Sequence, residues 1–303
     1  NGHIDKIEVL GFVDRYSSVN WLKESGCKVL NLLTKGSKKH CMYQLRKKAE
    51  QHIEDIKETV KIAYDQGLVV NIYLEDWSNG MRNSKDYVFK MIDSLKESKI
   101  NRFMLPDTLG ILNPDETYQF ISETIERYPD LEFDFHAHND YDLATANVYS
   151  ALKAGVNCIH GTVNGLGERA GNMSISGIIT IVKDHFKYEM NVNEEKLNLV
   201  SKMVEMYSGI HIPPNKPIIG ENVFTQTAGI HADGDMKKNL YHNDIKPERF
   251  GRKHSYALGK TSGKSNIKKN LEEMGIELDE ESMKKVTAKV IELGDKKETV
   301  TQE

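Results

Sequence analysis

One run of the sequence alternates between polar and apolar side chains. It ends in two histidines that are separated by one residue. Every second residue of this run is polar, namely Glu132, Asp134, His136 and His138. Since successive side chains of a strand point to opposite faces, this run predicts a strand with one polar face that ends in two imidazoles. Two imidazoles at i and i+2 can bind one divalent metal from the same side. The alternative is a solvated histidine pair. The metal site is favoured because every side chain on the same face of the predicted strand is polar.

Polar side chains also end other predicted strands. Tyr73 and Glu75 are two residues apart at the end of one predicted strand, so they point to the same face. Thr108 ends the next predicted strand. The carboxyl ends of parallel strands meet at one rim of a barrel, where active sites lie. These side chains are therefore candidates for the same site, although a salt bridge inside the rim is an alternative role for Glu75.

Short apolar runs alternate with amphipathic helical segments along most of the chain. One helical segment spaces its apolar residues by three or four from Leu45 to Ala63, and another begins with the capping sequence Asn113-Pro114. Strand, helix and strand in repetition predict parallel strands joined by crossover helices. The predicted strands are 7–13, 28–34, 69–75, 102–108, 131–138 and 158–164.

These six βα units fit either a doubly wound sheet or part of a (βα)8 TIM barrel. We expect a barrel that lacks its first two βα units in this chain, because the first apolar run begins almost at residue 1. Six strands would leave two open edges, so the chain alone should be inactive and prone to aggregate. The expected domains are the partial barrel at 1–208, a small irregular subdomain at 209–265, and a helical subdomain at 266–303.

Composition excludes several classes of protein. Lys and Arg total 41 against 45 Asp and Glu, so the net charge of -4 gives no basic excess for nucleic acid. No apolar run reaches the roughly 18 residues of a membrane span, and no signal peptide is recognisable. The three cysteines, Cys27, Cys41 and Cys158, are widely spaced and indicate reduced thiols in a cytoplasmic protein.

Two glycine-rich segments are near matches to nucleotide-binding motifs. The segment 165–171 has three residues before its third glycine, where the dinucleotide fingerprint has two. The segment 259–265 is one residue short of a P-loop and follows no predicted βαβ strand. Neither segment therefore predicts nucleotide binding.

Three segments together resemble a known family, the 2-isopropylmalate, homocitrate and citramalate synthases. They are His136-Ala137-His138-Asn139-Asp140, the string from Asn164 to Asn172, and Gly229-Ile230-His231-Ala232-Asp233-Gly234. The resemblance covers nearly the whole chain. It is strongest with the citramalate-forming members, through Tyr73-Leu74-Glu75-Asp76-Trp77, Phe224-Thr225-Gln226-Thr227-Ala228 and Asn239-Leu240-Tyr241. It implies a (βα)8 barrel with its site at the carboxyl ends of the strands.

The resemblance also implies roles for individual residues. A divalent zinc, manganese or magnesium ion would be bound by His136 and His138, with Asn172 in or near its coordination sphere. Thr108 would bind the carboxylate of an α-keto acid, and His231 assisted by Glu75 would handle a proton of acetyl-CoA. A linker that closes the site, meets acetyl-CoA and reaches over the partner of a homodimer would carry Asp233, Asn239, Leu240 and Tyr241. The family's first strand, which ends in an Arg-Asp pair, has no counterpart here.

The implied reaction condenses acetyl-CoA with pyruvate to give citramalate and CoA, a step of isoleucine biosynthesis. We expect Leu10, Leu33 and Tyr73 to line the pocket for the keto-acid side chain, although Tyr73 could instead be ordinary barrel packing. The alternative enzyme is 2-isopropylmalate synthase, which uses a larger keto acid. A hydroxymethylglutaryl-CoA lyase is disfavoured because its loop cysteine is replaced by Glu168-Arg169-Ala170. An inactive metal-binding remnant remains the non-enzymatic alternative.

Overall fold

The computed structural model describes residues 2–226, 243–259 and 262–296. It divides the chain into two compact units, Asn1–Ile181 and Val182–Glu303. The first unit holds a parallel sheet of six strands in the order of the sequence, so each strand pairs with the next along the chain. The strands are β1 (Glu8–Phe12), β2 (Val29–Lys35), β3 (Val69–Glu75), β4 (Ile100–Asp107), β5 (Phe133–Ala137) and β6 (Cys158–His160).

This sheet confirms the predicted α/β architecture of six βα units, with one correction to a boundary. The sixth strand was predicted over 158–164 but ends at His160. Asn164 adopts a left-handed backbone with φ of 63° inside the turn Val163–Gly165, and that conformation cannot continue a strand. Among the described strands, β1 and β6 each have one neighbour, so the sheet is an open part of a barrel.

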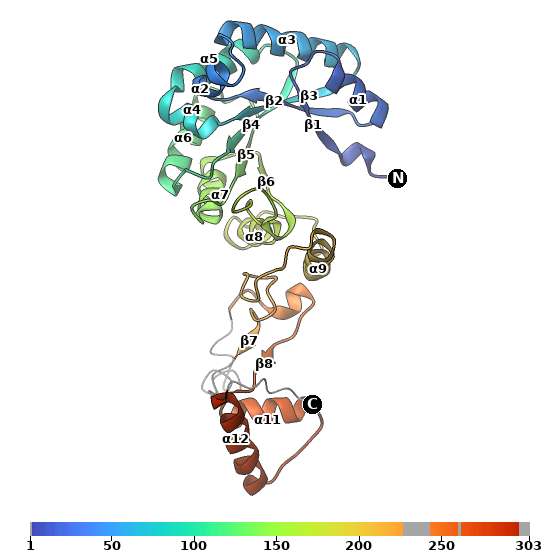
Figure 1. Ribbon diagram of the computed structural model, residues 1–303, viewed down its shortest axis with the longest axis vertical. Coiled ribbons are helices and arrows are strands. Elements are labelled where there is room, and N and C mark those ends of the chain that lie inside the picture. The colour runs from blue at the N-terminus through green and yellow to red at the C-terminus, as the bar shows by residue number, and fades with distance from the viewer. Residues whose placement is uncertain (1, 227–242, 260–261, 297–303) are drawn as a thin grey trace. The chain divides into compact units, whose positions relative to one another are not determined.

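Helices follow the strands and cover the outer face of the curved sheet (Figure 1). Helix α3 buries Ile53, Ile56 and Val60 as the apolar spacing predicted, but it begins at Ala49, so Leu45 lies outside it. Helix α6 begins with the predicted cap, in which the Asn113 side chain accepts a hydrogen bond from the Glu116 amide at 2.9 Å. The helices are α1 (Ser17–Ser25), α2 (Lys38–Tyr43), α3 (Ala49–Asp65), α4 (Trp77–Asn83), α5 (Lys85–Leu95), α6 (Pro114–Arg127), α7 (Ala144–Ala154) and α8 (Ile175–Thr180).

The two faces of the sheet differ in polarity. The outer face packs fully buried apolar side chains such as Leu32, Ile72 and Phe135 against the helices. The inner face carries a polar row at its amino-terminal end, where Asn71 donates hydrogen bonds to Asn31 at 2.8 Å and to Glu8 at 3.2 Å. The apolar core of this unit therefore lies between sheet and helices.

A buried histidine joins helix α3 to the end of strand β2. His52 is 1% exposed, and its Nε2 accepts a hydrogen bond from the Lys35 amide at 3.1 Å. Burial, and then the positive charge of Lys47, lowers the pKa of His52 to about 4. An imidazolium here would turn Nε2 into a donor facing another donor, so the folded state holds the neutral form.

We expect this histidine to make the fold sensitive to acid. The unfolded chain binds the proton near the ordinary value of 6.5 and the folded chain near 4, so stability present above pH 6.5 is lost as the pH falls towards 4. Two and a half pKa units correspond to about 3 kcal/mol. Urea unfolding between pH 7 and 4 should show this loss in the wild type and a smaller loss in His52→Gln. Equal losses in both proteins would contradict the assignment.

The second unit is built around two small apolar clusters. One contains Ile218, Ile219, Phe224 and Phe250, and the other contains Ile267, Met283 and Val290. Its helices and strands are α9 (Leu197–Ser208), β7 (Thr225–Gln226), β8 (Ser255–Tyr256), α11 (Lys264–Glu273) and α12 (Glu280–Asp295). Helices α11 and α12 occupy most of the segment 266–303, for which helical structure was predicted.

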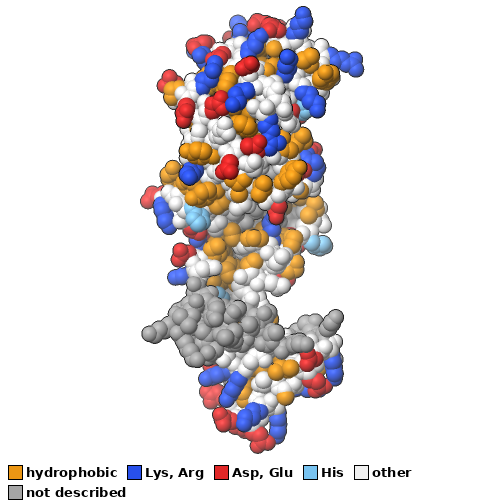
Figure 2. Space-filling view, turned by 90° about the vertical axis from the view of Figure 1, so that its left-hand side faces the viewer, with side chains coloured by type: hydrophobic (Ala, Val, Ile, Leu, Met, Phe, Trp, Pro, Cys, Tyr) orange, Lys and Arg blue, Asp and Glu red, His pale blue; other side chains and the backbone are white. Residues whose placement is uncertain are grey.

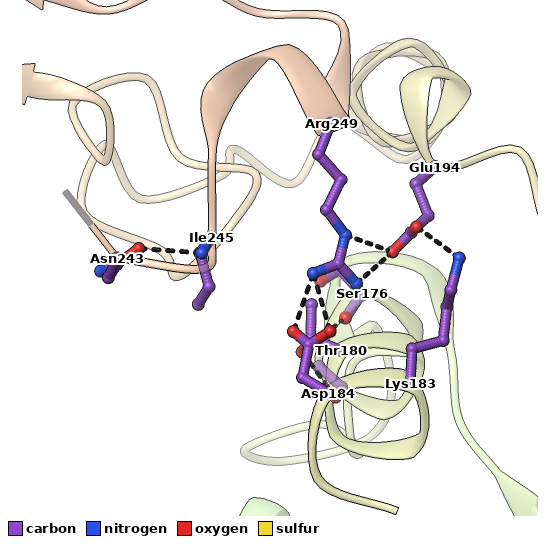
Figure 3. A network of polar contacts seen from close by, with 9 residues as sticks. Ser176, Thr180, Lys183, Asp184, Glu194, Asn243, Ile245 and Arg249 are labelled. Carbon is purple, nitrogen blue, oxygen red and sulfur yellow. Dashed lines mark hydrogen bonds and ion pairs between the residues drawn. The ribbon is translucent and has the colours of Figure 1, made fainter. Parts of the chain in front are cut away.

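Arg249 is the centre of the polar contacts in this unit (Figure 3). Its guanidinium donates to both carboxylate oxygens of Asp184 at 2.8 Å and to Glu194 at 2.6 and 2.9 Å. Lys183 donates to the other oxygen of Glu194 at 2.6 Å. Two carboxylates thus hold one arginine in a charge-assisted network that fixes segments far apart in the sequence.

The surface of the first unit mixes both signs of charge. Figure 2 shows Lys and Arg side chains interspersed with Asp and Glu side chains on its visible face. Every helix in the described part of the chain is too short or too polar to cross a membrane.

Candidate active site

His136 and His138 lie side by side at the carboxyl end of β5. Their ring centroids are 5.0 Å apart, and the ring of His136 also lies 5.9 Å from that of His160 on β6. His138 pairs with Asn172 in an isolated antiparallel bridge. The structure therefore brings together the three residues expected to bind a metal.

The loop between Asn164 and Asn172 places the Asn172 side chain through close backbone approaches. Gly171 has φ of 82°, and a Cβ on it would lie 2.1 Å from the Gly165 carbonyl oxygen. A Cβ on Gly167 would lie 2.2 Å from the Asn172 amide nitrogen. That nitrogen donates to the Leu166 carbonyl oxygen at 3.0 Å, so the orientation of the amide is fixed. The glycines of this string are explained by sterics, without a nucleotide.

The side-chain atoms that have no hydrogen-bond partner at this site are of types that bind a metal ion. His138 Nδ1 and Asn172 Oδ1 are buried and have no hydrogen-bond partner among the residues that the structure describes. Burial, followed by the charges of His160 and His138, lowers the pKa of His136 to about 3. Burial, followed by the charge of Arg169, also lowers the pKa of His138. Neutral imidazoles and an amide oxygen are suitable ligands for a divalent transition metal.

Arg169 connects the three loops that surround these ligands. Its guanidinium donates to Asp140 at 2.7 and 3.0 Å and to the Thr108 carbonyl oxygen at 2.9 Å. The loops after β4, β5 and β6 are thereby joined at one point. Such a connection limits how far the candidate metal ligands can move apart.

Tyr73 and Glu75 occupy the same inner face, at the end of β3. The Tyr73 ring lies 6.1 Å from the His136 ring in an edge-to-face arrangement. Glu75 forms a short ion pair with Lys35 of β2, whose side chain is only 8% exposed. The salt bridge considered as an alternative for Glu75 therefore exists. Lys35 was not among the expected site residues, although it stands directly beside Glu75 in the β2–β3 register.

The Thr108 hydroxyl can donate a hydrogen bond to a substrate. Its Oγ1 accepts a hydrogen bond from the Asp76 amide at 2.8 Å, which leaves the hydroxyl proton for another acceptor. The preceding residue, Asp107, instead caps its own turn, because its carboxylate accepts from the amides of Ile111 and Leu112 at 3.0 Å. Thr108 therefore suits an anionic substrate better than Asp107 does.

The pairing of β1 with β2 adds a residue to the expected pocket. Leu33 stands level with Phe12 and Tyr73, whereas Leu10 stands level with Asn31, one layer nearer the amino-terminal end. Phe12 and Leu10 are 53% and 52% exposed on this inner face. Sequence reasoning missed Phe12 because the register between two strands is not visible in either strand alone.

Five residues expected to meet acetyl-CoA or its proton lie outside the described residues. They are His231, Asp233, Asn239, Leu240 and Tyr241.

The sequence comparisons identify the family of the chain. Residues 15–204 match the HMGL-like family, and residues 218–298 match the family described as homocitrate synthase post-HMGL domain-like. The chain belongs to the HMGL-like family.

Particular relatives come from the synthases of this family. A probable 2-isopropylmalate synthase of Methanopyrus kandleri is 38% identical over 257 residues, 85% of this chain and 51% of that protein. A putative (R)-citramalate synthase of the same organism is 34% identical over 92% of this chain and 54% of that protein. The chain therefore spans about half the length of these two relatives.

Solved structures support the barrel architecture. The hydroxymethylglutaryl-CoA lyase of Bacillus subtilis superposes with a TM-score of 0.61 at 21% identity, covering 69% of this chain and 72% of the lyase. At that identity the similarity concerns the fold alone.

Proposed function

We propose that this chain carries the catalytic part of an enzyme that condenses acetyl-CoA with pyruvate to give (R)-citramalate and CoA. The observation that carries the proposal is the convergence of His136, His138 and Asn172 at the rim where Tyr73 and Glu75 also end their strand. The synthase relatives support the reaction class. The condensation consumes one water, because the thioester is hydrolysed as CoA leaves.

The proposed metal ligands are His136, His138 and Asn172. A zinc, manganese or magnesium ion at this position would supply a Lewis acid that draws charge onto the keto oxygen of the substrate. The Asn172 amide nitrogen is already engaged with Leu166, so its oxygen is the atom left to face an ion. Loss of any one ligand should therefore weaken metal binding directly.

The other side chains bind substrate and move a proton. Thr108 donates its hydroxyl proton to the keto-acid carboxylate. Glu75, held by Lys35, assists His231 in removing one proton from the acetyl methyl group. The carbon so exposed forms the new bond to the keto carbon, and the keto oxygen gains a proton to become the product hydroxyl.

The size of the keto acid is limited by Tyr73, Leu33 and Leu10, with Phe12 added by the strand register. A ring 6.1 Å from His136 occupies space that an isopropyl group would need beside the ligands. Pyruvate, which carries only a methyl group, fits this limit. The second candidate is 2-isopropylmalate synthase, and the 38% identical probable 2-isopropylmalate synthase of Methanopyrus kandleri favours it.

We infer a partial barrel at 1–208, a linker subdomain at 209–265 and a helical subdomain at 266–303. Acetyl-CoA would meet the linker at Asp233, Asn239, Leu240 and Tyr241, and the linker would join two copies into a homodimer. The reaction belongs to the cytoplasm, where both substrates occur, and it supplies isoleucine biosynthesis.

The proposed substrate is tested by a keto-acid panel. The protein expressed from its complete coding sequence should release CoA from acetyl-CoA with pyruvate, and much more slowly with α-ketoisovalerate or α-ketoglutarate. Free thiol is measured for each acid at several concentrations. Faster release with α-ketoisovalerate would replace the citramalate proposal by the isopropylmalate one, and release independent of any keto acid would reject both.

A further inference from the structure

A second group of side chains of metal-ligating types lies on the inner face, with Asp134 and Cys158 one layer below His136 and with His160 level with it. Asp134 on β5 stands beside Cys158 on β6, and His136 stands beside His160. The Asp134 carboxylate, the Cys158 sulfur and the His160 ring each offer one ligand atom, and these atoms all lie within 4.8 Å of one another. None of the three residues belongs to the site proposed above.

Asp134 gives independent support for a ligand at this position. It is 0% exposed, and its Oδ1 has no hydrogen-bond partner within the described part of the chain. Its Oδ2 lies 3.2 Å from His160 Nε2 and 3.3 Å from Arg102 Nε. Arg102 in turn donates to Glu8 at 2.6 Å, so its charge is shared with a second carboxylate. A fully buried carboxylate oxygen without a partner is costly unless something binds it.

We infer that Asp134, Cys158 and His160 form a second metal site, which selects zinc or a similar borderline-soft ion such as cobalt. A thiolate, an imidazole and a carboxylate are typical zinc ligands, whereas magnesium prefers oxygen ligands alone. Three protein ligands leave a fourth position open to water. On uptake the metal forms bonds to sulfur, nitrogen and oxygen, and the protons of the thiol and of the imidazolium pass to solvent.

Occupation of this site would join β6 to its only described neighbour. Strand β6 has three residues and pairs with β5 over three positions. A metal bound from both strands would add a connection that backbone pairing alone does not provide. Zinc should therefore slow the opening of β6, independently of the reaction at the rim.

Cobalt provides the test, because a thiolate ligand gives Co²⁺ an intense near-ultraviolet charge-transfer band that imidazole and amide ligands do not give. Titrating the reduced protein, expressed from its complete coding sequence, with Co²⁺ should produce this band at stoichiometric metal. The band should be lost in Cys158→Ser and retained in Cys41→Ser, which removes a buried thiol outside the cluster. It should also be retained in His138→Ala, so failure here is distinguishable from failure of the proposed function.

Alkylation supplies a second readout that does not depend on spectra or variants. Zinc at about ten times its dissociation constant should slow modification of Cys158 by iodoacetamide about tenfold, as measured by peptide mass spectrometry. Magnesium at the same concentration should have no such effect. Absence of the charge-transfer band, persistence of that band in Cys158→Ser, or an unchanged alkylation rate with zinc would each overturn the inference.

Discussion

Replacing His138 by alanine should abolish turnover and reduce the metal content of the enzyme. His138 and His136 supply the two nitrogen ligands of the proposed rim site, and their rings lie 5.0 Å apart. Mutating even groups that only support a metal ligand costs about 10- to 100-fold in metal affinity or activity, so removing a ligand should cost at least about a hundredfold. Metal content is measured by elemental analysis, and turnover by CoA release from acetyl-CoA and pyruvate.

An exposed histidine provides the control for this experiment. The His211 side chain is 92% exposed and contacts Glu205 rather than the rim, so His211→Ala should retain full metal content and turnover. Undiminished activity of the His138→Ala enzyme, with its metal retained, would show that the metal is bound elsewhere. Loss of activity with unchanged metal content would assign His138 to substrate instead.

Replacing Tyr73 by serine should shift the preference of the enzyme from pyruvate towards α-ketoisovalerate. The ring lies 6.1 Å from His136, where the side chain of the keto acid would project. Removing it opens space for two more methyl groups, and contacts of that size are worth about 1–3 kcal/mol, or roughly 10- to 200-fold. The measured quantity is the ratio of kcat/KM for the two acids, in Tyr73→Ser and in the double variant with Leu33→Ala.

An exposed tyrosine distinguishes a pocket effect from a general one. Tyr207 is 76% exposed on α9, and Tyr207→Ser should leave the ratio unchanged. If Tyr73→Ser lowers kcat/KM equally for both acids, Tyr73 is packing rather than a selectivity residue. If the wild type already prefers α-ketoisovalerate, the citramalate proposal is wrong.

Much of the first unit could be predicted from the sequence, because the signals there are local. The alternation from Glu132 to His138 identified β5 and assigned its polar face, and the Asn113 cap located the start of α6. Strand β6 was overextended because the local turn signal Asn164-Gly165 was not used, and Asn164 takes a left-handed backbone there. The proposed metal ligands His136, His138 and Asn172 were expected from family resemblance, and the structure brings those residues together.

Contacts between strands could not be predicted in the same way. Lys35 lies beside Glu75, and Cys158 beside Asp134, only because the strands pair in one particular register. A shift of a single residue would turn each side chain to the opposite face. Phe12 was missed for the same reason. Leu10 and Phe12 point to the same face of β1, and only the pairing of Phe12 with Leu33 shows which of them lies level with Leu33.

The most direct test of the account uses acetyl-CoA that carries three deuterons on its methyl group. With pyruvate and the protein expressed from its complete coding sequence, the product should be citramalate that retains two deuterons, because the methyl group loses one as the new carbon–carbon bond forms. Chelating the metal should stop this product, and adding a divalent metal back should restore it. Release of CoA without a doubly deuterated hydroxy diacid, or product formation that survives metal removal, would contradict a metal-dependent condensation at this rim.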